Sequence, residues 1–498
     1  MNSKWYLGVL AIVSMAFLNA CSGVGDSGGG GGCTTNCGGG TANLTISLYD
    51  SPPSGANVLD FVLPITGISL TPSSGSNVNV PVTVSSPEVT RLQTDSTVIV
   101  DQTPIAAGTY TAINVTLGPS NSSGNLFLNT SGGPITSGTV SCLNNSICDL
   151  PVGAAYTISI PISFTLTSNG NQWVGLDLNL NNIITAPTPT SIGVDFAQAG
   201  AMTATTTPRT NITAGVDLVE DYTGVVTAVS SSSISVQSGI AGTTLTASIT
   251  SNTEVNIAPD AYSQSQCSGT GSLSCVLVGS TVSLDTVLAS DGSFTATEID
   301  VLDATAVDEV EGIILPYNNG GVVGIQLILA DKEAVTSSAL TSATYGANVL
   351  LTPSANPTYS IDYKTLSSVS NQITGFSGSG SLLAGQVVRV QLSNINTDAS
   401  GDITGTANNV LLRWSRLTGS VNTVASPTFT VANIPSYIYT LNPTLNPTPQ
   451  VNTFTSLTEF VGATGVSDLQ PQGTASYRAL FLASGSQYPF QAAKIVVQ

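Results

Sequence analysis

Short runs in which apolar and polar residues alternate constrain the fold of this chain more than any other feature of its sequence. One such run is Leu44–Leu48, and in two others, Val78–Val84 and Val174–Leu180, every second residue is Val or Leu. Because successive side chains of a β-strand point to opposite faces of a sheet, this period of two predicts half-buried strands. Gly, Pro, Asn and Ser separate the runs, as they do between strands. The 498 residues therefore predict an all-β protein with several domains.

The strand spacing over residues 42–200 predicts an antiparallel β-sandwich. Its first run leads into Tyr49–Pro52 (YDSP), and a later strand, Gly108–Ile113, reads GTYTAI. The two motifs resemble domain-of-unknown-function family 4382 of bacterial lipoproteins, whose members open with a strand ending in Thr-Asp-Ala-Pro and later carry a Gly-x-Tyr-x-x-Ile strand. The resemblance covers about one third of the chain. It implies a β-sandwich on a lipoprotein and no known activity.

The second half of the chain repeats. Three segments open alike around a glycine, and similar strands follow each of them in the same order; the openings are Tyr222–Val226, Val310–Ile314 and Leu417–Val421. Landmarks in a constant order are the signature of tandem domains, here residues 220–303, 308–414 and 415–498. With a central step at Thr253-Glu254 and Thr458-Glu459, the repeats resemble domain-of-unknown-function family 5666. That resemblance implies small β-barrels, a class that includes the oligonucleotide/oligosaccharide-binding barrel.

The N-terminus has the pattern of a secretory signal. Lys4 precedes the apolar run Trp5–Leu18, and Leu18–Cys21 reads LNAC. The run is too short to span a bilayer as a mature helix, so we expect removal of residues 1–20, before Cys21. An ordinary signal with a chance cysteine is the alternative.

The LNAC segment resembles the lipobox of bacterial lipoproteins. The resemblance implies that Cys21 carries lipid, palmitate included, and holds the chain in a membrane through its acyl chains. Ser22 rather than Asp after this cysteine implies the outer membrane, and leaves the periplasmic or surface side open. Residues 21–41 then form a glycine-rich tether.

Six further cysteines fall into three close pairs. Six cysteines allow 15 connectivities, and small local loops are typical of an oxidising compartment. Nearest-neighbour pairing is the economical prediction, with the bonds Cys33–Cys37, Cys142–Cys148 and Cys267–Cys275.

The charge of the chain excludes several classes of function. The net charge is −19, from 29 acidic and 10 basic residues, so phosphate backbones are repelled and nucleic acid is not expected as a partner. The chain has no histidine, which rules out Ser-His-Asp and Cys-His sites. Three lysines, Lys332, Lys364 and Lys494, show no partnered nucleophile. We therefore expect no enzyme, with a carboxylate-dependent envelope carbohydrate hydrolase as the alternative.

Acidic residues gather where the repeats join. Carboxylates of adjoining domains could share a calcium ion, which takes six to eight oxygen ligands. The candidate ligands are Asp217, Glu220, Asp221, Asp308, Glu309 and Glu311. Arg413 and Arg416 at the third junction speak against such an ion, and a solvated acidic linker is the simpler interpretation. No other cofactor is expected.

The sequence favours a membrane-anchored envelope lipoprotein that acts as a non-catalytic binding or structural module. Its partners would be the lipid bilayer, through Cys21, and an envelope protein or polysaccharide. A surface adhesin is a further alternative. Polar linkers would let the domains shift against one another. Aromatic residues that could stack on sugars are Trp173, Trp414, Tyr437, Tyr439 and Phe454, and a strand at 437–439 would place both of its tyrosines on one face.

Overall fold

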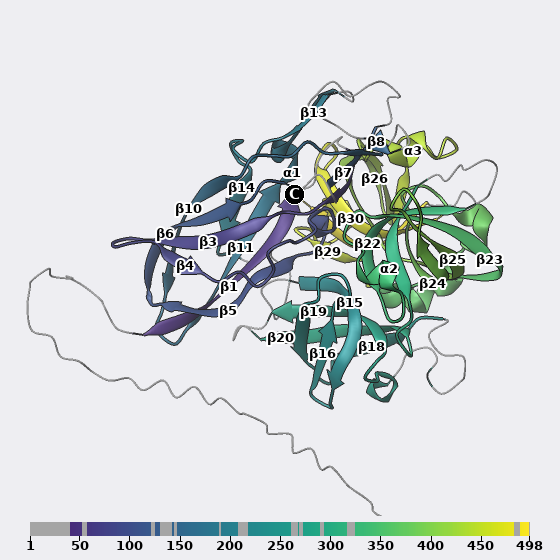
Figure 1. The fold of residues 1–498 in the computed structure, drawn as a ribbon. Helices are drawn as coiled ribbons and strands as arrows, with labels where there is room; N and C mark the ends of the chain where they lie inside the picture. The colour runs from purple at the N-terminus through teal and green to yellow at the C-terminus, as the bar shows by residue number, and fades with distance from the viewer. Residues whose placement is uncertain are drawn as a thin grey trace, which may run out of the picture. The chain divides into compact units, whose positions relative to one another are not determined.

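β-Strands make up nearly all of the regular structure, as predicted, in the computed structural model of the chain (Figure 1). The strands form a sandwich followed by three small barrel-like sheets. The structure describes residues 40–51, 57–120, 125–129, 142–143, 147–188, 191–207, 218–259, 267, 272–288, 293–315, 324–482 and 489–497. The lipidation candidate Cys21 lies outside these residues. Within them, no helix is both long and apolar enough to cross a membrane.

The sandwich consists of two four-stranded sheets, in the orders β14-β11-β1-β5 and β10-β6-β3-β4. Their strands are β1 (Thr41–Ser51), β3 (Ile65–Pro72), β4 (Val78–Val80), β5 (Thr97–Ala106), β6 (Gly108–Leu117), β10 (Tyr156–Leu166), β11 (Asn171–Asn179) and β14 (Met202–Thr205). Leu44, Ile46 and Leu48 of β1 are fully buried, as their alternation predicted. One pair departs from the antiparallel prediction, because β1 runs parallel to β11. These two strands are far apart in the sequence, so no hairpin fixes their direction.

A smaller sheet, in the order β2-β7-β9-β8, lies beside the sandwich. Its strands are β2 (Val58–Phe61), β7 (Asn125–Leu128), β8 (Cys142–Leu143) and β9 (Ile147–Asp149), and a one-turn helix, η1 (Thr90–Gln93), lies near β2. The same region of the chain holds α1 (Leu180–Ile183) and the hairpin β12 (Ile184–Thr188) and β13 (Ser191–Val194). Leu59, Leu126 and Ile147 of the smaller sheet belong to the hydrophobic core of the third repeat.

The second repeat forms a closed barrel in the order β21-β22-β23-β25-β24. Its elements are β21 (Glu309–Leu315), β22 (Ile325–Glu333), α2 (Ser338–Thr341), β23 (Asn348–Ile361), η3 (Lys364–Gln372), η4 (Ser379–Ser381), β24 (Val387–Thr397) and β25 (Ile403–Leu412). β23 runs parallel to β25, and every other neighbouring pair is antiparallel. Five strands with this order and one parallel closure have the topology of the oligonucleotide/oligosaccharide-binding barrel.

The first and third repeats have the same topology, with the third strand split in two. In the first repeat β17 and β18 both run parallel to β20, and in the third β28 and β29 both run parallel to β31. The first repeat holds β15 (Leu218–Val229), β16 (Ser233–Gln237), β17 (Thr244–Ser248), β18 (Glu254–Ile257), η2 (Leu273–Cys275), β19 (Thr281–Leu288) and β20 (Phe294–Asp303). The third holds β26 (Ser415–Ala425), β27 (Thr428–Ala432), α3 (Tyr437–Thr440), β28 (Gln450–Thr453), β29 (Glu459–Val461), η5 (Val466–Asp468), β30 (Thr474–Phe481) and β31 (Phe490–Val497).

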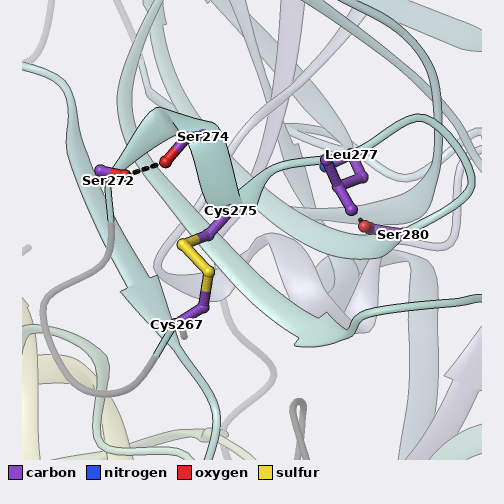
Figure 2. The surroundings of a disulfide bond; sticks show 6 residues. All are labelled: Cys267, Ser272, Ser274, Cys275, Leu277 and Ser280. Carbon is purple, nitrogen blue, oxygen red and sulfur yellow. Dashed lines mark hydrogen bonds between the residues drawn. A yellow bond between two sulfur atoms is a disulfide. The ribbon is translucent and has the colours of Figure 1, made fainter. Parts of the chain in front are cut away.

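Two of the three predicted disulfides are confirmed, Cys142–Cys148 and Cys267–Cys275. Figure 2 shows the second bond beside η2, where the hydroxyl of Ser280 also accepts a hydrogen bond from the backbone N–H of Leu277. Cys33 and Cys37 lie outside the described residues. Each confirmed bond closes a short local loop, so nearest-neighbour pairing was the correct criterion for both.

The hydrophobic cores cross the domain borders. Trp173 of the sandwich belongs to the core of the first repeat, and Leu480 of the third repeat belongs to the core of the second. The described residues all lie in one compact unit, Gly38–Gln498. The borders between the domains therefore include apolar contacts as well as linkers, and the expectation that the domains shift against one another stays a prediction.

Candidate functional site

The charged residues of this protein are concentrated inside it. Every basic residue that the structure describes is buried or half-buried: Arg91, Lys332, Lys364, Arg389, Arg413, Arg416, Arg478 and Lys494. Fifteen acidic residues are buried too, whereas only Asp101, Glu254, Asp398 and Asp468 are described as exposed. Most of the described charged side chains therefore lie in the interior of the protein and not on its surface. Buried charges persist when they are paired, so their partners define the candidate site.

Asp221 on β15 is the first centre of the charge network. Its carboxylate lies 2.6 Å from Lys364 Nζ, 3.5 Å from Arg413 Nη2 and 3.4 Å from Arg478 Nη1, and it also pairs with Arg416. Burial by itself raises the pKa of Asp221, but the four cations outweigh burial and hold that pKa well below its usual range. One carboxylate of the first repeat thus joins side chains of the second and third repeats.

The backbone brings Asp221 and Lys364 together in uncommon conformations. Asp221 has φ +51° and lies where the pairing of β15 with β19 shifts register between Val219 and Tyr222, and Lys364 has φ +40° at the start of η3. A non-glycine residue in the left-handed region costs roughly 1–3 kcal/mol and persists where its surroundings determine it. Here the register shift turns the carboxylate toward the second repeat.

Arg413 is the second centre. It is 1% exposed and follows β25 directly. Its Nη1 pairs with Asp362 and lies 3.5 Å from Asp300, and its Nε lies 3.3 Å from Glu311. A further bond of 3.2 Å runs from Nη2 to the hydroxyl of Ser283. The guanidinium group therefore contacts residues of the first and of the second repeat at the same time.

Arg389 on β24 is the third centre, and it contacts carboxylates of the second repeat only. It pairs with Glu309, and its Nη1 lies 3.6 Å from Glu311 and 3.7 Å from Asp331. The strand register places Glu309 opposite Glu333 and Glu311 opposite Asp331. Like charges directly opposite each other destabilise a sheet, so these strands depend on the guanidinium between them.

The sandwich reaches the network through the segment around η1. Arg91 Nη2 lies 2.9 Å from Glu311, and Asp95 pairs with Arg416. The hydroxyl of Thr418 also donates to the side-chain oxygen of Gln93 at 2.9 Å. Sandwich and repeats are thus joined by charge-assisted hydrogen bonds as well as by apolar packing.

Several carboxyl groups of the network lack enough cations, and their pKa values are raised. Burial is the main cause: it raises the pKa of Asp331 to about 6, of Glu298 to about 7, of Glu333 to about 8 and of Asp303 to about 9. For Asp60, burial and the neighbouring Glu88 raise the pKa well above its usual range. Carboxyl groups with lowered and with raised pKa values therefore stand close together in the interior.

Two cavities border the network. One of about 60 Å³ lies among the sandwich, second and third repeats, and one of about 140 Å³ also borders the first repeat. Glu88, Arg91, Ala330 and Arg416 line both of them. Asp95 and Asp221, which line the larger cavity, both pair with Arg416, so the network here joins domains.

The calcium candidates are not gathered around a common point in the described residues. Asp221, Glu309 and Glu311 face the cations above, and Asp308 accepts the backbone N–H groups of Val335, Thr336 and Ser337. No three His, Cys, Asp or Glu side chains among the described residues could hold a metal ion. Asp217 lies outside the described residues, as does the side chain of Glu220. The sequence analysis counted Arg413 and Arg416 as evidence against a bound ion. In the structure Arg413 pairs with Asp221 and Glu311, and Arg416 pairs with Asp221.

Most of the aromatic residues that could stack on sugars are buried, and the strand expected at residues 437–439 is not formed. Trp414 and Tyr437 are buried, at 1% and 4% exposure, and Tyr439 and Phe454 are half-buried. Residues 437–440 form the helix α3, which begins directly after Pro435 and Ser436, rather than a strand. Trp173 is buried too, and its indole N–H donates to the hydroxyl of Ser47. These aromatic residues fill the cores between domains, as large apolar side chains most often do.

The three lysines are also part of the interior, which sequence reasoning missed. Lys332 Nζ donates to the carbonyls of Leu340, Thr341 and Ala343 around α2, and Lys494 lies 3.9 Å from Glu459. The available signal was scarcity: with charged residues at 8% of the chain, a lysine inside a strand pattern indicates a paired interior position.

The fold and its network define a class: a multidomain all-β protein with a sandwich, three closed or nearly closed barrels and ion-paired borders. Residues 41–213 match the family model described as "Domain of unknown function (DUF4382)", which confirms the resemblance of the first domain. Among curated proteins, none matches the chain.

The solved structures that match this chain include one that is similar over part of its length. It is a multidomain protein with nucleic acid binding domains from Streptococcus pneumoniae TIGR4, 11% identical over 56% of this chain and 72% of that chain, with a TM-score of 0.11. A TM-score this low carries no argument about the function of the present protein.

Proposed function

We propose that the protein is a lipid-anchored, non-catalytic module of the cell envelope, in which four β domains act as one rigid body. The observation that carries this proposal is the internal use of charge. Asp221 and Arg413 tie the repeats together, and Arg91 and Arg416 tie the sandwich to them. A body with most of its charged groups committed to internal pairs suits a spacer or binding scaffold better than acid–base catalysis.

The anchor is the part of the proposal that rests on sequence. Cys21 in its lipobox-like context would carry the acyl chains, with Ser22 directing the protein to the outer membrane. Two or more acyl chains suffice for stable attachment without a membrane-spanning helix. Similarity of the repeats to family 5666 would make them recurrent envelope modules.

The partner is expected to be an uncharged polysaccharide or an envelope protein. The described surface carries no exposed basic residue, and the net charge of −19 repels anionic partners, so a highly anionic partner is not expected. Hydroxyl and amide groups on exposed strands can instead offer hydrogen bonds.

The decisive experiment fractionates cells that express the full chain or its Cys21→Ser variant. We expect the unaltered chain in the membrane fraction, labelled by palmitate, and the variant unlabelled and released in soluble form. Equal membrane retention of both would overturn the lipid anchor. Protease digestion of intact cells then separates a surface adhesin, which would be cut, from a periplasm-facing module.

A second experiment tests the binding role with the chain from Ser22 onward. Saturable binding to a neutral glycan or an envelope fraction is expected, and binding should be retained after disruption of the exposed acid Asp398 by Asp398→Asn. Absence of binding to every probe would leave the spacer role alone.

A carboxylate-dependent hydrolase is the second candidate, favoured by one observation. Asp331 has a pKa raised by burial to about 6 and lines the cavity of about 140 Å³. Release of sugars from envelope polysaccharide by the unaltered chain, lost in Asp331→Asn, would replace the non-catalytic proposal.

A further inference from the structure

A tight turn recurs at the same place in all three repeats, directly before the strands β19, β24 and β30. The three turns are residues 277–280, 383–386 and 470–473. In each turn the backbone N–H of the fourth residue donates to the carbonyl of the first residue, at 3.0, 3.2 and 2.9 Å. The third residue has a positive φ, which is +91° at Gly279 and at Gly385 and +71° at Gln472. The three turns are therefore equivalent parts of one repeated barrel.

The turn of the second repeat is covered by the third repeat. The side-chain amide of Asn442, shortly after α3, accepts a hydrogen bond from the N–H of Ala384 at 3.2 Å and donates one to its carbonyl at 2.9 Å. A Cβ added at Gly385 would collide with the side chain of Ile438 and lie 3.2 Å from Tyr437 Cε2. One helical turn with an aliphatic and an aromatic side chain, followed by an asparagine, thus covers this position.

The equivalent turn of the first repeat is not covered by any of the described residues. Leu277 and Val278 are 50% and 64% exposed, and Val278 takes the place of the buried Ala384. A Cβ added at Gly279 would meet no atom of the described residues within 4 Å. Within that part of the chain, no hydrogen bond engages the backbone of Val278. The groups that bind Asn442 in the second repeat are therefore open to a partner in the first.

The exposed turn of the first repeat is held in a fixed shape. The disulfide bond between Cys267 and Cys275 closes the loop directly before it, and Figure 2 shows Leu277 and Ser280 of the turn next to this bond. The hydroxyl of Ser280 accepts the N–H of Leu277 at 3.3 Å, and the N–H of Gly279 donates into the barrel. A surface that is already ordered loses little conformational entropy when a partner binds.

A third apolar side chain extends this surface. The carbonyl of Gly279 accepts the N–H of Ala306 at 2.7 Å, so the segment that leads into the second repeat runs beside the turn. Val307, the next residue, is also exposed. Leu277, Val278 and Val307 are three of the few large apolar side chains that the described surface exposes, and such groupings mark interaction sites.

The second repeat has the segment that could cover this turn, but uses it within its own barrel. Residues 334–347 connect β22 to β23, as the segment with α3 connects β27 to β28. Their short helix α2 contacts β24, and Lys332 donates to three carbonyl groups around it. The N–H of Val335 is bound by Asp308. This segment is therefore committed to the second barrel.

The turn of the third repeat is exposed as well, but it is polar. Its exposed residues are Gln470, Pro471 and Gln472. A polar outer face is usual at the end of an array of repeats. The aliphatic side chains at the turn of the first repeat are therefore not a general property of an uncovered turn.

We propose that residues 277–280 and Val307 form a docking site for one helical turn of a partner protein, with an aliphatic and an aromatic side chain followed by an asparagine. The apolar side chains would pack on Leu277 and Val278, and the asparagine amide would bond to the N–H and carbonyl of Val278. Short helical segments with apolar anchors are a common mode of recognition. The α3 of a second copy is already buried in its own chain, so the partner is a different protein.

The test traps the contact by disulfide exchange. It uses the chain from Ser22 onward with Val278→Cys and a synthetic peptide with the sequence of residues 433–445 in which Tyr437→Cys supplies the thiol. The matched control is Val152→Cys, because Val152 is 57% exposed and lies in the first domain. We expect the mixed disulfide to form about tenfold faster at Val278→Cys than at the control, because binding raises the effective concentration of the thiol.

A second peptide, with Ile438→Asp and Asn442→Ala added, should react at the control rate. Equal rates for Val278→Cys and Val152→Cys, or a rate advantage that the second peptide keeps, would overturn the docking site. If Val278→Cys does not fold, hydrogen exchange of the unaltered chain replaces it. Exchange at residues 277–280 should then slow with the unaltered peptide only, and no slowing would overturn the site. Neither measurement involves Cys21 or a glycan, so its failure is distinct from failure of the proposed function.

Discussion

Two regions of the same molecule use opposite chemistry. The sheet β10-β6-β3-β4 contains no charged residue, and its exposed side chains are joined by hydroxyl pairs such as Thr109–Thr165 and Thr116–Thr157, both at 3.1 Å. The strands β21 and β22, by contrast, bury Glu309, Glu311, Asp331, Lys332 and Glu333. The difference teaches that charge here fixes one domain against another, whereas hydroxyl and amide groups face the solvent. Removing a charge should therefore cost far more than removing a hydroxyl group.

Removing a buried charge should have the largest effect on the stability of the protein. Arg413→Met removes the guanidinium that Asp362, Asp300 and Glu311 share, and leaves buried carboxylates without their partner. We expect a loss of about 3–5 kcal/mol in the free energy of unfolding, the usual range for breaking a buried pair. Denaturation by urea, monitored by circular dichroism, measures it. A loss below 1 kcal/mol would show that the network contributes little to holding the domains.

Asp221→Asn should have a somewhat smaller effect, and one that depends on pH. The low pKa of Asp221, held down by its four cations against the effect of burial, gives stability that is present above pH 4 and lost as the pH falls. The variant should be less stable than the unaltered chain at pH 7, by about 2–3 kcal/mol, and the difference should begin to shrink as the pH falls below 4. Urea midpoints between pH 3 and 7 test this. A difference that stays constant over that range would contradict the assignment.

Removing a hydroxyl group from the uncharged sheet of the sandwich should have the smallest effect on stability. Thr165→Val removes one hydroxyl of the exposed pair with Thr109 on the outer face of the sandwich. Because water can satisfy the remaining hydroxyl group, we expect a change within about 0.5 kcal/mol. The same urea assay applies, and a loss as large as that of Arg413→Met would abolish the contrast between the two regions.

The sequence was informative where a local pattern decides the structure. The alternation at Leu44–Leu48 predicted a buried strand, and the close spacing of Cys267 and Cys275 predicted their bond. The repeated openings at Gly224, Gly312 and Gly419 predicted domains that prove to share one topology. Each of these inferences needed only residues within one element or one repeat.

The candidate site could not be predicted in this way, because its members come from separate domains. The acids near Asp221 and Glu311 were assigned to a linker or an ion, and Arg413 and Arg416 were counted against that ion rather than recognised as partners. Which carboxylate meets which guanidinium depends on how barrels pack, and the sequence separation of Asp95 and Arg416 gives no local signal. Tyr437 was misplaced for a simpler reason, since Pro435 starts a helical turn within an otherwise strand-like segment.

The smaller sheet of the first domain sets an order of events during biosynthesis. Asn57, just before β2, bonds to Ser436 of the third repeat at 3.0 Å, and Leu59 and Leu126 lie in the core of that repeat. At a synthesis rate of about 5–20 residues per second, the delay between translating these two contacts is on the order of tens of seconds. The family 4382 portion therefore emerges early with an apolar flank that only the last barrel covers. A chain truncated before residue 415 would lack the barrel that covers this flank, and its apolar residues would be open to aggregation.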